Sequence, residues 1–100
     1  MGLNIAVPRD KIIEFCHRNG IRRLSFFGSV LRDDFTPDSD IDVLVEFEPE
    51  MRVGLIRFSG MALELEEILG HRVDLNTPQC LSRYFRQEVL DQAEVMYDAA

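Results

Sequence analysis

Residues 38–47 read DSDIDVLVEF, and this stretch decides the fold. Its alternation of polar and apolar residues predicts a β-strand over 40–47, because successive strand side chains point to opposite faces of a sheet. The apolar face consists of Ile41, Val43, Val45 and Phe47, and the other face of Asp40, Asp42, Leu44 and Glu46. One face therefore packs into a core, while the other carries a pair of carboxylates.

Helical patterns flank this strand on both sides. Apolar residues at helical spacing predict helices over 8–18 and 55–69, and a glycine follows each as a stop. Residues 29–32 form one or two helical turns in this interpretation. A further helical stretch is expected over 78–91, interrupted near Ser82.

Short apolar runs predict three more strands, over 24–27, 72–75 and 95–97. Polar, turn-rich segments at 33–39 and 48–52 bound the central strand. Strands and helices that alternate in this way predict an α/β (α+β) fold, a small mixed sheet of about four strands with helices packed on it.

Length and composition indicate one globular domain over residues 1–100. Hydrophobic residues make up 46% of the chain and charged residues 29%, which is ordinary for a globular protein that buries its own core. The two cysteines, Cys16 and Cys80, match no metal-binding spacing and are expected to be reduced thiols. The sequence has neither a signal-peptide pattern nor an apolar run of membrane-spanning length, so a cytoplasmic location is expected.

The net charge of −7 limits the partners. A domain that grips a polynucleotide is expected to carry a basic face. Extended nucleic-acid binding is therefore not expected, and a free nucleotide is the better candidate. An acidic chain of this size is also compatible with a homo-oligomer or a hetero-oligomer.

The carboxylates of Asp40 and Asp42 point the same way on the predicted strand. Their Cα atoms are about 6.5–7 Å apart at this spacing, so both side chains can reach one hard cation such as Mg²⁺, or two ions about 3.5–4 Å apart. The plain alternative is a solvated turn, which suits Asp38 better than this pair, because aspartate is disfavoured in strands. A calcium loop counted from Asp38 fails, since its sixth residue is Val43 and its twelfth is Pro49.

Gly28 and Ser29 end the strand predicted over 24–27. Glycine lets a backbone approach a ligand closely, and a serine hydroxyl can donate to a phosphate oxygen. Such a dipeptide is usually an ordinary turn. Its position makes it a candidate, because it ends one predicted strand, and the carboxylate pair begins the next strand twelve residues after Gly28.

Two segments together, FGSVLR at 27–32 and SDIDVLV at 39–45, resemble the signature of the DNA polymerase beta-type nucleotidyltransferase superfamily. Within it, the chain is most similar to the minimal nucleotidyltransferases, which have no appended domain. Many members have glycine after the arginine of the first motif, whereas this chain has Asp33, which affects the path of the loop.

The resemblance implies a third carboxylate on a later strand, and Asp74 is the matching position. By the same resemblance, Asp40, Asp42 and Asp74 are catalytic and bind Mg²⁺, and Asp74 also acts as the general base. Gly28 and Ser29 would hold the phosphates of ATP, and Arg32 either contacts phosphate or is a solvated residue at a helix end.

Three functions remain open at this point. The resemblance implies transfer of AMP from ATP to a hydroxyl of a partner protein, with the chain acting as the antitoxin of a HEPN-domain toxin. Transfer to a small molecule, as in aminoglycoside nucleotidyltransferases, is less favoured because those enzymes carry extra helical domains. A module that neutralises a toxin by contact alone is the third alternative.

Overall fold

The structure is a computed structural model that describes residues 7–32 and 35–99. In chain order its elements are α1 (Arg9–Asn19), β1 (Ile21–Phe27), the 3₁₀ turn η1 (Gly28–Leu31), β2 (Ile41–Phe47), α2 (Leu55–Leu69), β3 (Val73–Asn76), the 3₁₀ turn η2 (Pro78–Cys80), α3 (Arg86–Gln92) and β4 (Glu94–Asp98).

The four strands form one mixed sheet in the order β3-β2-β1-β4, which confirms the predicted sheet. β1 runs antiparallel to both of its neighbours, β2 and β4. β3 lies parallel to β2, and α2 is the crossover that a parallel pair requires. β3 and β4 are therefore the two edges of the sheet.

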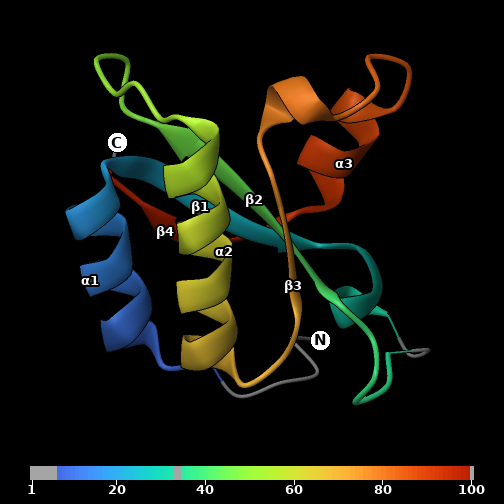
Figure 1. Ribbon diagram of the computed structural model, residues 1–100. Helices are drawn as coiled ribbons and strands as arrows, with labels where there is room; N and C mark the ends of the chain where they lie inside the picture. Colours follow the sequence, from blue (N-terminus) through green and yellow to red (C-terminus); the bar gives the residue numbers. More distant parts are fainter. Residues whose placement is uncertain (1–6, 33–34, 100) are drawn as a thin grey trace.

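Two helices, α1 and α2, cover one face of the sheet (Figure 1). The core between them contains Phe15 of α1, Leu65 of α2, and Phe26 and Val43 of the central strands, all fully buried. Burial of each such side chain contributes about 1.5–3 kcal/mol. The opposite face carries the polar side of β2 and is covered in part by α3.

Several boundaries differ from the sequence prediction. β1 begins at Ile21, three residues before the predicted start at Leu24. The strand extends this far because ion pairs with Glu46 and Asp98 stabilise Arg23 at the sheet surface. The strand predicted from residue 40 begins at Ile41. In the C-terminal third, the predicted interruption near Ser82 is confirmed, but the regular helix is shorter than expected, seven residues long.

The predicted thiols are confirmed as free cysteines, Cys16 buried and Cys80 exposed. Among the described residues, no helix has both the length and the apolar character needed to cross a membrane. Residues 33 and 34, which include the departure at Asp33, lie outside the described ranges.

Candidate active site

A tight turn at Gly28 connects the end of β1 to η1. Gly28 has a φ of 76°, in the left-handed region that favours glycine. A Cβ atom here would lie 2.1 Å from Oδ2 of Asp42, far inside van der Waals contact. Glycine at this position therefore serves two purposes, since it forms the turn and leaves space for a carboxylate.

The strand register places the second carboxylate beside the third. Asp42 is paired with Phe27 on β1 and with Asp74 on β3. Paired residues on adjacent strands lie about 4.7–4.9 Å apart and project to the same face. The turn at Gly28, Asp42 and Asp74 thus form a row across three neighbouring strands, on the face away from α1 and α2.

The pKa of Asp42 is raised above its ordinary value of 3.8. Partial burial is the largest cause, and repulsion from Asp74 and then from Asp40 adds to it. The positive charge of Arg32 and the Ser29 backbone N–H, which donates to the Asp42 carboxylate, oppose the shift. Burial and the neighbouring carboxylates therefore both favour the protonated form of Asp42.

Asp40 has a different partner. Its Oδ1 lies 3.0 Å from Nε of Arg72, the residue just before β3. Arg72 also donates from Nη2 to the backbone carbonyl of Asp38 at 2.7 Å, so it ties the segment before β2 to the start of β3. Arg72 was not predicted as a site residue, although a cation two residues before Asp74 and beside an acidic cluster was a usable signal.

The three carboxylates do not converge in this structure. Across residues 7–32 and 35–99, no three carboxylate, imidazole or thiol groups are arranged to hold one metal ion. The donor set nevertheless suits a hard divalent cation, because Asp40, Asp42 and Asp74 offer only oxygen ligands. The repulsion that raises the pKa of Asp42 is also the interaction that a bound cation would cancel.

Ser29 and Arg32 lie on the other side of Asp42 from Asp74. The Ser29 hydroxyl donates to the Asp40 carbonyl at 3.4 Å, the long limit of a hydrogen bond, and is therefore weakly held. Arg32 is exposed at the end of η1, near enough for its charge to act on Asp42. The site thus has hydroxyl and cationic groups at the β1 end and carboxylates toward β3.

Known proteins share this chain's sequence pattern and its fold. A family model described as a nucleotidyltransferase domain matches residues 9–95. A Methanocaldococcus jannaschii protein named "Putative protein adenylyltransferase MJ0435" is 37% identical over 92 residues, covering 91% of this chain and 96% of that protein. Protein adenylyltransferase MntA of Thermococcus cleftensis is 38% identical over 84 residues, covering 84% of this chain and 81% of MntA.

Two solved structures extend the comparison. A toxin–antitoxin crystal structure with AMP-PNP matches with a TM-score of 0.73 at 24% identity, covering 92% of this chain and 74% of that chain, and shows the shared fold. A complex of a tri-AMPylated Shewanella oneidensis HEPN toxin with its MNT antitoxin matches with a TM-score of 0.65 at 25% identity, covering 90% and 69%. The family match over most of the chain, together with the close relatives, shows that this protein belongs to the nucleotidyltransferase domain family.

Proposed function

We propose that the protein transfers AMP from ATP to a hydroxyl group of a partner protein. The observation that carries this proposal is the row formed by the Gly28 turn, Asp42 and Asp74 across β1, β2 and β3. A phosphoryl-transfer site needs a phosphate cradle and acidic groups side by side, because its catalysis consists mainly of positioning and electrostatic stabilisation.

The β1 end of the row holds the phosphates. With no side chain at Gly28, the backbone can approach a phosphate oxygen, and the weakly held Ser29 hydroxyl is free to donate to one. Arg32 adds a positive charge at the same end. The pyrophosphate leaving group is therefore expected on the side of β1.

The β3 end of the row receives the acceptor. Asp74 is exposed and lies across Asp42 from the phosphate side, where it can accept the proton of an attacking hydroxyl. Mg²⁺ held by Asp40, Asp42 and Asp74 would supply Lewis-acid neutralisation of the charge on the phosphate oxygens. Arg72 engages Oδ1 of Asp40 and therefore competes with a cation for this carboxylate.

We further propose that the acceptor belongs to a HEPN-domain toxin and that this chain is its antitoxin, acting in the cytoplasm. Support comes from relatives named protein adenylyltransferases and from the similarity to an MNT antitoxin that is bound to an AMPylated HEPN toxin. Chemistry, rather than contact alone, is the favoured mode of neutralisation, because the cradle and all three carboxylates are present.

The test is a transfer assay with ATP labelled at the α-phosphate, Mg²⁺ and a HEPN-domain protein encoded beside this chain. Label is expected on the partner with the unaltered protein and with the control Glu67→Gln, an exposed change on α2. No label is expected with Asp42→Asn. A stable complex without label would favour a contact-only antitoxin, and undiminished label with Asp42→Asn would refute the assigned chemistry.

A further inference from the structure

The outer side of α2 exposes large apolar side chains. Ile56 is 90% exposed and Leu63 64%, and they lie seven residues apart, two helical turns along the same side of the helix. Leu55, which is 81% exposed, lies next to Ile56. Met61 and Leu65 take the opposite, buried side of α2. Single exposed apolar residues are normal on a protein surface, whereas a group of them on one side of a helix indicates an interaction surface.

Gly60 lies between Ile56 and Leu63 on the exposed side of α2. Glycine is a weak helix former, and a Cβ atom at Gly60 would meet nothing within 4 Å. Packing within the chain therefore does not require glycine at this position. A second helix would benefit from it, because the distance between two packed helix axes, about 8–10 Å, depends on the size of the side chains at the contact. We call Leu55, Ile56, Gly60 and Leu63 the α2 surface.

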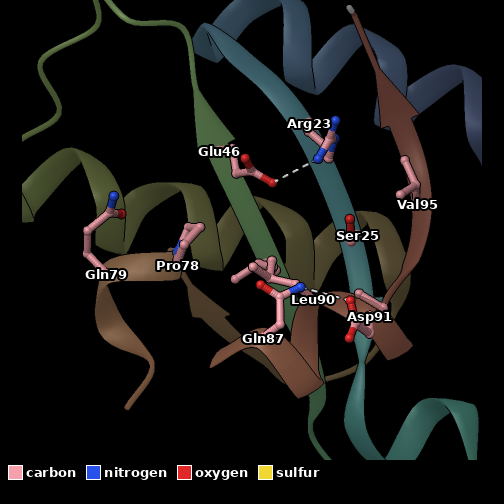
Figure 2. Close-up of a pocket in the computed structure, with 11 residues that line it drawn as sticks. Arg23, Ser25, Glu46, Pro78, Gln79, Gln87, Leu90, Asp91 and Val95 are labelled. Atoms are coloured by element: carbon pink, nitrogen blue, oxygen red, sulfur yellow. Dashed lines mark hydrogen bonds and ion pairs between the residues drawn. The ribbon is translucent and has the colours of Figure 1, made fainter. Parts of the chain in front are cut away.

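The α2 surface and the candidate active site lie on opposite sides of the sheet. α2 covers one face beside α1 (Figure 1). The row of Gly28, Asp42 and Asp74 belongs to the other face, where Gln87 and Leu90 of α3 line a cavity of about 450 Å³ together with residues of the sheet (Figure 2). A molecule that binds over the active site therefore leaves the α2 surface available for a different contact.

The charges beside the α2 surface are complementary to themselves. Arg57 and Glu64 directly follow Ile56 and Leu63, so they lie along one border of the surface and are also two turns apart. When two copies of α2 pack antiparallel about a two-fold axis near Gly60, Arg57 of each copy faces Glu64 of the other. In the same arrangement Ile56 of each copy faces Leu63 of the other. Parallel packing would instead place like charges against each other.

Both charges are available for such a contact. Arg57 is exposed, and its Nη2 donates to the Arg18 carbonyl at 3.4 Å, the long limit of a hydrogen bond. Glu64 accepts from Arg18 through Oε2. Because an ionised carboxylate can accept several hydrogen bonds, Glu64 can engage Arg18 of its own chain and Arg57 of a second copy together.

We propose that the α2 surface is the contact between two copies of this chain, which pack antiparallel about a two-fold axis near Gly60. With 15 residues α2 is about 22 Å long. One pair of helices of this length buries less than the roughly 800 Å² per partner of a standard interface, so the dimer is expected to form at micromolar concentrations. Both candidate active sites then face outward. The inference goes beyond the proposed function and does not depend on it.

Sedimentation equilibrium over a micromolar concentration series tests the contact. The mass of the unaltered protein should rise with concentration from 11.5 kDa toward twice that value. Ile56→Asp should raise the Kd of the dimer about tenfold or more, because it places a charge at the centre of an apolar contact. Tyr84→Asp is the matched control, since Tyr84 is also highly exposed but lies outside α2, and it should dimerise normally.

A charge exchange tests the antiparallel geometry. Arg57→Glu and Glu64→Arg should each dimerise more weakly than the unaltered protein, because each places like charges against each other across the axis. An equimolar mixture of the two variants should recover the dimer, since every pair across the axis then has opposite signs. Such recovery cannot arise from a folding change within either chain.

Three results would overturn the inference. The first is an unaltered protein that stays at 11.5 kDa throughout the concentration series. The second is a mixture of the charge variants that dimerises no better than either variant alone. The third is protection of α2 from hydrogen exchange that appears only when the acceptor protein is added, because the α2 surface would then bind that protein and not a second copy.

Discussion

Replacement of Gly28 by alanine tests the central geometry of the site. The new Cβ atom would lie 2.1 Å from Asp42 Oδ2, whereas ordinary contact begins at 3.4 Å, so the carboxylate has to move by about 1.3 Å. The Asp42 Cγ and Cβ atoms lie further off, at 3.1 and 3.4 Å, so rotation of the carboxylate relieves most of the clash. The backbone cost of a left-handed alanine is about 1–2 kcal/mol.

The expected result is a large loss of rate with a modest loss of stability. A 1 Å misplacement within a reacting site costs up to about 10²-fold, so Gly28→Ala should transfer AMP roughly a hundredfold more slowly. Its free energy of unfolding should fall by about 1–2 kcal/mol, a decrease of roughly 4–16 °C in Tm for a chain of this size.

Gly70→Ala is the matched control. Gly70 has a φ of 71°, close to that of Gly28, and a Cβ atom there would meet nothing within 4 Å. Both variants should lose similar stability in thermal denaturation, and only Gly28→Ala should lose activity in a pyrophosphate-release assay. A Gly28→Ala rate within threefold of the Gly70→Ala rate would refute the contact with Asp42.

Three further predictions address single groups. Because the pKa of Asp42 is raised, its negative charge destabilises the folded state at pH values above that pKa. Asp42→Asn should therefore have a higher Tm than the unaltered protein at pH 7, and the difference should vanish below pH 3.8. A lower Tm at pH 7 would contradict this. Arg72→Gln should change the free energy of unfolding by less than about 1 kcal/mol, since the ion pair of Arg72 with Asp40 is exposed. Because this change releases Asp40, it should lower the Mg²⁺ concentration needed for half-maximal transfer. A rise in that concentration would show that Arg72 assists the site instead. Burial raises the pKa of Cys16 to about 12, whereas hydrogen bonds from Thr77 lower the pKa of the exposed Cys80. A thiol reagent should therefore react with one cysteine in the native protein and with two in denaturant.

The sequence predicted the parts of the fold that depend on local pattern. The alternation over 41–47 and the helical spacing over 55–69 each determine one element, because one face of each is apolar and must be buried. The start of β1 was missed because Arg22 and Arg23 conceal the strand pattern. Arg23 is stabilised there by Glu46 and Asp98, which come from distant parts of the chain.

The candidate site was only partly predictable for the same reason. The spacing of Asp40 and Asp42 is local and could be read directly, whereas the placement of Asp74 beside Asp42 depends on a parallel register set by the crossover through α2. The ion pair between Asp40 and Arg72 joins residues 32 positions apart. The cavity lined by Ser25, Leu44, Gln87 and Leu90 is likewise assembled from both halves of the chain, and no single segment carries its pattern.

In the proposed mechanism, where the acceptor approaches Asp74, the position of β3 at the edge of the sheet determines what size of acceptor can be served. Asp74 is exposed on a four-residue strand with a single neighbour, β2. A whole folded protein can therefore present a surface hydroxyl there without unfolding a loop or threading it into a channel. In that mechanism, discrimination among acceptors depends on how their surfaces fit beside this edge.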